Sequence, residues 1–287
     1  MKTLTVLPIL FLLAGALAAQ ASVRVPLDVR PENGMHLANA TLDGVPCRLL
    51  VDTGATHTTF DLSFVTNRFP SVRLQDVELR GTTNVEFVPK YFPYASFRLG
   101  EHAFASTGAL AVPLGGLHAS VGERVDGILG MSDLSSGDFI LRDRELVFAP
   151  SDDMCARFGP DVGRRGDAYS PLVVGAHAGK KILFLVDSGS SFTFVDESLW
   201  RASTNAVSLS ATEISGRSEL LPRVGEEGEL DLGVKLAIRP MVARRDVNYL
   251  GADILKSCDV LFRARGRGIF FRPLPKTGAG EAPVAKD

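Results

Sequence analysis

The sequence is poor in the residues that build disulfide frameworks and zinc sites. Its three cysteines, Cys47, Cys155 and Cys258, are too few and too scattered across 287 residues for either kind of site. One disulfide with an odd thiol left over is compatible with this number, but we expect all three side chains to be small buried apolar groups. The five histidines form no H-E-x-x-H pair and no close cluster with cysteine. We therefore expect no metal and no other cofactor.

An excess of charge of either sign is also missing. Lys and Arg number 31 against 33 Asp and Glu, which gives a net charge of -2. This balance gives no reason to expect nucleic acid or an anionic membrane surface as a partner. The basic cluster "RARGRG" (residues 263–268) aligns with the earlier segment "RDRELV" (residues 142–147), and we interpret it as a solvated hairpin turn. With 45% hydrophobic and 22% charged residues, the composition is that of a globular protein with material for a core.

The N-terminus has the order of a secretory signal peptide. Lys2 precedes the apolar run "LTVLPILFLLAGALAA", and Ala19-Gln20-Ala21 supplies an A-x-A cleavage site. The run is shorter than the roughly 20 residues that a spanning helix needs, so a membrane anchor is the weaker interpretation. We expect residues 1–21 to be removed on export to a periplasm or to the outside of the cell. At the other end, residues 276–287 are rich in Gly, Ala and Pro and are expected to be disordered.

The chain repeats itself. The segment "GVPCRLLVDTGATHTTFDLSF", which begins at Gly44, aligns without a gap with "GKKILFLVDSGSSFTFVDESL", which begins at Gly179. Asp52 thereby pairs with Asp187, 135 positions later. Farther along, "ILGMSDLSSGDFIL" aligns with "YLGADILKSCDVLF", where matching residues are only 121 positions apart. Repeats of this kind indicate a duplicated structural unit. The smaller offset means that the second copy has lost residues between 216 and 251.

Both copies are composed mainly of strands. Segments such as "CRLLV", "ILFLV" and "DFILRDRELVFAP" are short, rich in branched or aromatic residues, and bounded by Gly, Asp or Pro. Long helical periodicity is scarce, and short helices are expected only after each repeated Leu-Gly and after "TTFD" and "FVDE". The sequence therefore predicts an all-β protein with two homologous halves, residues 22–150 and 151–275. A loop rich in charge and glycine, residues 151–170, would connect them.

Each half ends an apolar strand on an aspartate that is followed by Thr or Ser and then by Gly. A buried carboxylate is costly unless hydrogen bonds or a partner support it, so Asp52 and Asp187 are expected to be paired or functional. A single Asp-Ser/Thr-Gly is more often a turn closed by its own side chain. Two copies, each after an apolar strand and each followed by a matching Leu-Gly, form a far more specific pattern.

This pattern resembles that of the pepsin and retropepsin superfamily of aspartic proteases, over nearly all of the chain between the signal peptide and the tail. The resemblance implies two β-barrel lobes with an active-site cleft between them and few short helices. It makes Asp52 and Asp187 a catalytic pair that activates a water molecule for attack on a peptide bond. It further implies that five neighbours support the pair, namely Thr53, Gly54, Ser188, Gly189 and Ser190. The triplets Ile128-Leu129-Gly130 and Tyr249-Leu250-Gly251 would support the catalytic loops from below.

The superfamily covers its substrate with a β-hairpin flap. The segment "RGTTN" around Gly81 falls where a flap tip is expected, so Gly81, Thr82 and Thr83 are candidate substrate-binding residues. An ordinary hairpin turn is the alternative interpretation. If Gly216, which aligns with Gly81, tips a second hairpin, the protein would be closer to a fused retropepsin dimer than to pepsin.

Together these observations predict a secreted, monomeric endopeptidase that cleaves protein or peptide segments bound in an extended form. Ala55 stands where pepsin-type enzymes carry Ser or Thr, so fewer hydroxyl groups would reach the pair, and we expect an optimum at about pH 5–6. The main alternative is a protein- or peptide-binding module that keeps the fold without catalysis. A serine hydrolase is disfavoured, because no G-x-S-x-G elbow surrounds Ser188.

Overall fold

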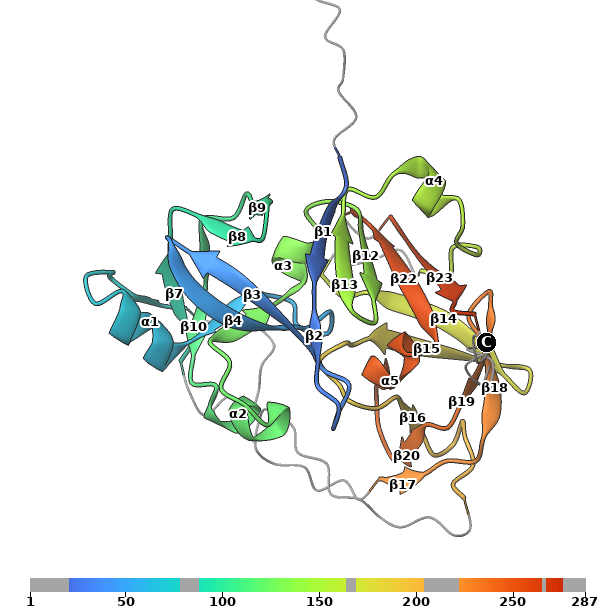
Figure 1. The fold of residues 1–287 in the computed structure, drawn as a ribbon. Coiled ribbons are helices and arrows are strands. Elements are labelled where there is room, and N and C mark those ends of the chain that lie inside the picture. Colours follow the sequence, from blue (N-terminus) through green and yellow to red (C-terminus); the bar gives the residue numbers. More distant parts are fainter. Residues whose placement is uncertain (1–20, 78–87, 164–168, 204–221, 265–266, 276–287) are drawn as a thin grey trace, which may run out of the picture.

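The computed structural model of the protein describes residues 21–77, 88–163, 169–203, 222–264 and 267–275. These residues form three β-sheets and five short helices, whose arrangement Figure 1 shows. One sheet belongs to the first half of the chain, one to the second half, and the third is shared between them. The expectation of an all-β, two-lobed fold is confirmed.

The sheet of the first half contains β2 (Asp28–Val29), β3 (His36–Leu42), β4 (Val45–Val51), β5 (Thr59–Asp61), β6 (Gln75–Asp76), β7 (Lys90–Pro93), β8 (Phe97–Leu99), β9 (His102–Phe104), β10 (Gly108–Val112) and β11 (Gly127–Leu129). Nine of them follow the order β6-β7-β10-β5-β11-β4-β3-β8-β9, and β2 pairs with β3. Most neighbours are antiparallel, but β4 runs parallel to β11 and β5 runs parallel to β10.

The sheet of the second half contains β14 (Leu172–His177), β15 (Lys180–Val186), β16 (Phe194–Asp196), β17 (Arg223–Val224), β18 (Gly228–Asp231), β19 (Lys235–Ile238), β20 (Met241–Ala243) and β21 (Asn248–Leu250). Its order is β17-β20-β16-β21-β15-β14-β18-β19. Here β15 runs parallel to β21, and β16 runs parallel to β20. The two parallel pairs therefore recur at matching places in both halves.

The shared sheet joins the two halves. It contains β1 (Val23–Pro26), β12 (Phe139–Arg142), β13 (Glu145–Phe148), β22 (Cys258–Arg263) and β23 (Gly268–Pro273), in the order β1-β13-β12-β22-β23. In Figure 1 the green strands β12 and β13 lie beside the orange-red β22 and β23. At the junction, Phe139 faces Phe262 across the β12–β22 ladder, and their rings stack with centroids 4.5 Å apart. The segment "RARGRG" lies at the β22–β23 hairpin, where Arg263 pairs with Gly268.

Two matching hairpins set the register of the strands that lead to the aspartates. β3 and β4 are joined by Asp43 and Gly44, with φ of 47° and 78°. β14 and β15 are joined by Ala178 and Gly179, with φ of 47° and 77°. Two central residues with positive φ form the tight turn whose twist suits antiparallel strands, and glycine adopts that conformation without a steric penalty. The second half thus keeps the turn geometry although Asp43 is replaced by alanine.

The helices are short: α1 (Leu62–Arg68), α2 (Gly115–Val121), α3 (Met131–Leu134), α4 (Asp152–Cys155) and α5 (Ala252–Leu255). Those after "TTFD" and after each Leu-Gly were expected. The helix expected after "FVDE" was wrong, because residues 197–199 form only a turn. The expected loop at 151–170 contains α4, a single turn in which the Met154 N–H donates to the Ser151 hydroxyl. α2 was also not expected, since it begins with two glycines, which are poor helix formers.

The two halves differ in the length of one connection, which joins β10 to β11 in the first half and β20 to β21 in the second. In the first half, residues 113–126 connect β10 to β11 and include α2; in the second half, residues 244–247 connect β20 to β21. Much of the length that the second copy has lost is therefore this helix and its flanks. In the first half, α2 covers a buried apolar cluster on one face of the sheet, formed by Met35, Leu37, Leu50, Val112, Leu114, Leu117, Val121, Val125 and Ile128.

The three cysteines are buried and free of disulfides. Burial raises the pKa of the Cys47 thiol to about 12, and the nearby charge of Asp126 adds to the effect. The thiol is therefore protonated and unreactive at neutral pH. Among the described residues, no helix is long and apolar enough to cross a membrane.

Candidate active site

The two aspartates of the repeated triplet lie at equivalent ends of two strands. β4 ends immediately before Asp52, and β15 ends immediately before Asp187. In each half the last residue of the parallel neighbour holds the aspartate backbone. The Asp52 N–H donates to the carbonyl of Leu129 (3.1 Å), and the Asp187 N–H donates to the carbonyl of Leu250 (2.9 Å). Equivalent pairs of parallel strands therefore fix the backbone position of each aspartate.

Each carboxylate accepts two backbone hydrogen bonds from its own loop. Asp52 Oδ1 accepts from the N–H groups of Gly54 (2.8 Å) and Ala55 (3.0 Å). In the second half, Asp187 Oδ1 accepts from Gly189 (3.0 Å) and from the following residue (3.1 Å). These bonds hold both carboxyl groups in one orientation and leave the second oxygen of each for other contacts.

The two carboxyl groups face each other across the boundary between the halves. A Cβ atom added to Gly54 would lie 2.5 Å from Asp187 Cγ, and one added to Gly189 would lie 2.4 Å from Asp52 Cγ. Real Cβ atoms do not approach other carbon atoms so closely, so glycine is required at both positions. Asp52 and Asp187 also hydrogen-bond to each other. The structure therefore brings together two residues that are 135 positions apart in the sequence.

Burial and mutual repulsion decide the protonation of this pair. Burial raises the pKa of Asp52, although hydrogen bonds from Asp187 and from backbone N–H groups oppose that rise. Burial raises the pKa of Asp187 well above its usual range, and the negative charge of Asp52 raises it further. Two adjacent carboxylates cannot both ionise readily, so the pair shares one proton over a pH range in which isolated aspartates are charged.

Thr53 and Ser188 lock the two loops together through four reciprocal hydrogen bonds. The Thr53 N–H donates to Ser188 Oγ (3.0 Å), and the Ser188 N–H donates to Thr53 Oγ1 (3.1 Å). Each hydroxyl then donates to the opposite strand: Thr53 Oγ1 to the carbonyl of Val186 (2.7 Å) and Ser188 Oγ to that of Val51 (2.8 Å). Both side chains are fully buried. The Ser188 hydroxyl is thus buried and hydrogen-bonded to the other half, so it is unsuited to act as a nucleophile.

Ser190 was expected to support the aspartate pair, and it does so through its backbone N–H and not through its hydroxyl. Its backbone N–H donates to Asp187, but its Oγ donates to the carbonyl of Phe192 (2.9 Å). The equivalent residue in the first half is Ala55, which has no hydroxyl. Both carboxylates are therefore held at this position by backbone N–H groups.

The two Leu-Gly motifs pack beneath the loops that carry Asp52 and Asp187. A Cβ on Gly130 would lie 2.6 Å from the backbone of His57, and one on Gly251 would lie 2.3 Å from the backbone of Phe192. The next residue in each half also bonds to the loop, since the Met131 N–H donates to Ala55 and the N–H after Gly251 donates to Ser190. The glycines let the strand ends approach the loops closely enough to hold them.

Thr58 and Thr193 are supporting residues that sequence reasoning missed. Each lies six residues after its aspartate, and each hydroxyl accepts from the N–H of the Leu-Gly glycine, Gly130 or Gly251 (both 3.1 Å). Thr193 Oγ1 also donates to Asp253 Oδ1 (2.7 Å). Both threonines are buried. The signal was present, because the gapless alignment of the two copies places one threonine directly over the other.

Some expected features cannot be placed. The candidate flap residues Gly81, Thr82 and Thr83, and Gly216 of the second copy, lie outside the described residues. Within the described ranges, no group of three or more His, Cys, Asp or Glu side chains is arranged to hold a metal ion.

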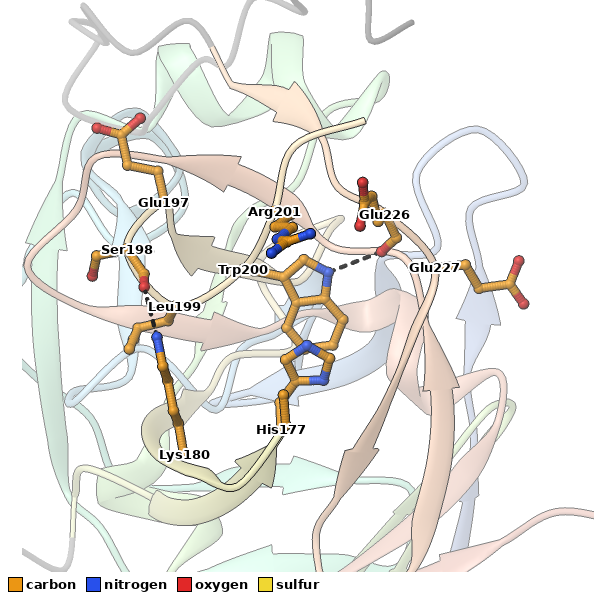
Figure 2. Close-up of a pocket in the computed structure, with 10 residues that line it drawn as sticks. His177, Lys180, Glu197, Ser198, Leu199, Trp200, Arg201, Glu226 and Glu227 are labelled. Atoms are coloured by element: carbon orange, nitrogen blue, oxygen red, sulfur yellow. Dashed lines mark hydrogen bonds between the residues drawn. The ribbon is translucent and has the colours of Figure 1, made fainter. Parts of the chain in front are cut away.

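A separate hollow of about 410 Å³ lies on the second half. Figure 2 shows His177 stacked on Trp200 in this hollow, with ring centroids 3.6 Å apart. Trp200 Nε1 donates to the carbonyl of Glu226 (2.9 Å), and Lys180 Nζ donates to that of Ser198 (3.3 Å). Both signs of charge line the hollow, and none of its residues belongs to the loops of the aspartate pair. The contacts of His177 and Lys180 hold the chain after β16 against β14 and β15.

One comparison with known proteins bears on the site. Residues 38–132 match the family model described as aspartyl protease. The matched segment contains Asp52, its loop and the first Leu-Gly motif. No curated protein matches the chain.

Proposed function

From this match, which places the chain in the pepsin/retropepsin-like clan of aspartyl proteases, we propose that the protein is an aspartic endopeptidase in which Asp52 and Asp187 act together. The observation that carries the proposal is the facing of the two buried carboxyl groups, each against the glycine of the opposite loop. The family match supports a protease-like function. The assignment of the reaction to this pair is our own.

The chemistry follows from the shared proton. The ionised carboxylate takes a proton from a water molecule, which attacks the carbonyl carbon of the peptide bond. The protonated carboxyl group donates a hydrogen bond to the carbonyl oxygen as negative charge develops there. The carboxyl group that took the proton from water then gives it to the amide nitrogen, the C–N bond breaks, and the amine leaves, so no covalent enzyme intermediate is formed. Both carboxyl groups must keep their positions within a fraction of an ångström, and the Thr53–Ser188 bonds provide that rigidity.

The proposed substrate is an extended segment of protein or peptide. A peptide bound in strand form offers its backbone N–H and C=O groups to the walls of a cleft, and its alternate side chains to pockets. We propose that the enzyme acts as a monomer, because one chain supplies both aspartates.

The test is cleavage of an unfolded protein from about pH 3 to about pH 8, with and without the aspartic protease inhibitor pepstatin. Asp52→Asn and Asp187→Asn are each expected to abolish cleavage, and Asp76→Asn, on exposed β6, should leave it unchanged. Circular dichroism of each variant controls for folding. A well-folded wild-type protein that cleaves nothing would favour the binding-module alternative. Cleavage that survives both dyad variants would overturn the mechanism.

We also propose that the protein is exported. Lys2, the apolar run that follows it and Ala19-Gln20-Ala21 support removal of residues 1–21. Mass spectrometry of the protein produced in an exporting host should find an N-terminus at Ser22. Recovery of the intact chain from the cytoplasm would count against export.

A further inference from the structure

An apolar surface covers one face of the second half's sheet. Val174 on β14 lies opposite Leu183 on β15, and the parallel register of β15 and β21 places Val247 beside Leu183. These three side chains are 37%, 37% and 44% exposed, and we call them the aliphatic row. Exposed apolar side chains that stand singly are ordinary, but a contiguous row across two strands and the residue that precedes a third is a feature of interaction sites.

The first half does not show this surface. The residues equivalent to Leu172 and Leu185 are Leu37 and Leu50, which α2 and its neighbours bury completely. The residue equivalent to Leu183 is Arg48, whose guanidinium forms ion pairs with Asp28 and Glu123. The second half has only residues 244–247 in place of the helix. The sheet face of the second half is therefore more open. It carries the apolar Leu183 at the position where the first half carries the charged Arg48.

Among the described residues of the second half, the Arg245 side chain takes the place of part of α2. Arg245 extends over the rings of Phe194 and Tyr249, with its guanidinium carbon 4.7 Å from each centroid. These two residues pair across β16 and β21, so Arg245 covers the part of the face nearest the end of β21. The aliphatic row lies outside the area that Arg245 covers, and its three side chains remain exposed to solvent.

The aliphatic row lies on the side of β15 that leads to the aspartate pair. Side chains two residues apart on a strand point to the same side, so Leu183, Leu185 and Asp187 share one face of β15 and its end. At about 3.3 Å per residue, Leu183 lies roughly 13 Å along the strand direction from Asp187. An extended peptide covers this distance with about four residues.

We propose that the aliphatic row binds an apolar segment of the substrate chain about four residues from the bond that is cut. This proposal rests on the proposed endopeptidase function and adds a docking site outside the reacting residues. The occupant is the substrate itself, because Leu183 and Leu185 lie on the side of β15 that leads to Asp187, with the Arg245 guanidinium over the neighbouring Tyr249 ring. The described part of the first half offers no matching site, so the preference concerns one side of the cleaved bond only.

The test uses Asp52→Asn protein, which keeps the fold and cannot consume its ligand. Three fluorescent synthetic peptides of equal length share an apolar central pair. One has polar flanks, one has Leu and Val in the segment before the central pair, and one has them after it. Fluorescence anisotropy should show one flanked peptide binding about tenfold more tightly than the peptide with polar flanks, which corresponds to about 1.4 kcal/mol.

Leu183→Lys and Val247→Lys in the same background should remove that difference, while Ala237→Lys, on exposed β19 of the same sheet, should preserve it. Leu183→Thr provides a milder variant that suits a strand if lysine prevents folding. Equal binding of all three peptides to a folded protein would overturn the proposal, as would a difference that the Leu183 and Val247 variants retain. Dimerisation that Leu183→Lys abolishes, measured by sedimentation, would mean that a second copy occupies the row, and would also overturn it.

The same peptides separate this proposal from the proposed function. If the wild-type protein cleaves nothing but Asp52→Asn still distinguishes the flanked peptides, the aliphatic row binds peptide and the endopeptidase assignment fails. If the wild type cleaves all three peptides with equal kcat/KM and binds them equally, the endopeptidase assignment stands and the docking site fails.

Discussion

Arg142 and Asp259 form an ion pair across the boundary between the two halves, with Arg142 Nε 3.4 Å from the Asp259 carboxylate. The reverse pair is also present, since Arg263 lies 2.5 Å from Asp138. Both arginines and both aspartates are 121 positions apart, so they occupy equivalent places in the two copies. Each half thus offers the other the same Asp and Arg, as the two subunits of a symmetric dimer do. Thr53 and Ser188, which are also equivalent residues, likewise exchange reciprocal hydrogen bonds across the boundary.

The two ion pairs should differ in their contribution to stability. The Asp259 side chain is 3% exposed and also binds Arg272, whereas that of Asp138 is 28% exposed. Removing one member of a buried pair leaves uncompensated buried charge, so Asp259→Asn should lower the free energy of unfolding by about 3 kcal/mol. Asp138→Asn should lower it by about 1 kcal/mol, because solvent screens that pair. Urea denaturation at neutral pH measures both, with the more exposed Asp143→Asn as a control. Equal losses at the two sites would contradict the argument.

The acid side of the activity profile should reflect the raised pKa of the aspartate pair. Burial raises the pKa of both Asp52 and Asp187, and protonating the second carboxyl group removes the base that activates water. Activity should therefore disappear on the acid side with a midpoint above about 4, the ordinary value for aspartate. A profile of kcat/KM against pH on a peptide substrate measures this midpoint. A rate maximum below about pH 3 would contradict it.

A matched variant tests which groups set that midpoint. The Ser190 hydroxyl donates to Phe192 and not to Asp187, so Ser190→Ala should leave the acid midpoint where it is in the wild type. A clear upward shift would mean that the hydroxyl reaches the carboxylate when the enzyme works.

The close approach of Gly54 to Asp187 predicts an intolerance to any side chain. In Gly54→Ala the new Cβ would meet the Asp187 carboxyl group at 2.5 Å, so the pair must separate. Turnover should fall by at least about 100-fold, because a misplacement of about 1 Å is enough for such a loss. Gly137→Ala is the control, since a Cβ there meets nothing within 4 Å. Peptide turnover by both purified variants gives the comparison. A Gly54→Ala enzyme with wild-type kcat would show that the carboxyl groups do not need this spacing.

Much of the site could be predicted because the duplication repeats it. The alignment of the two copies alone placed Asp52 over Asp187 and Thr53 over Ser188. The partners across the boundary were not predictable in the same way. Asp138 aligns with Asp259 in the sequence, but its partner is Arg263, and this pairing depends on the rotation that relates the halves. Local pattern carries no information about that rotation.

The asymmetry between the halves was the other part that the sequence concealed. The smaller offset indicated lost residues, but not that the loss uncovers a sheet face. In "ILFLV" the apolar residues run continuously, so Leu183 could not be assigned to the surface from periodicity. Its exposure follows from the lack of a counterpart to α2 in residues 244–247, between β20 and β21, and α2 itself was hidden by its two opening glycines.

The last prediction concerns Thr193, which joins the loop that carries Asp187 to α5. Its hydroxyl donates to Asp253 Oδ1 and accepts from the Gly251 N–H. Burial raises the pKa of Asp253, and hydrogen bonds from Thr193 hold that rise down. Thr193→Val removes the two bonds of the hydroxyl and keeps the bond from the backbone N–H, so it should lower the free energy of unfolding at pH 7 by about 1–3 kcal/mol. Because the folded-state pKa lies above the unfolded value, protonation of Asp253 favours the folded state as pH falls through the folded-state pKa. The loss should therefore be smaller at about pH 4 than at pH 7, as urea denaturation at the two pH values will show. Thr193→Ser keeps the hydroxyl and should behave as the wild type at both. An equal loss in Thr193→Val at both pH values would mean that the bond to Gly251, and not the charge on Asp253, accounts for the effect.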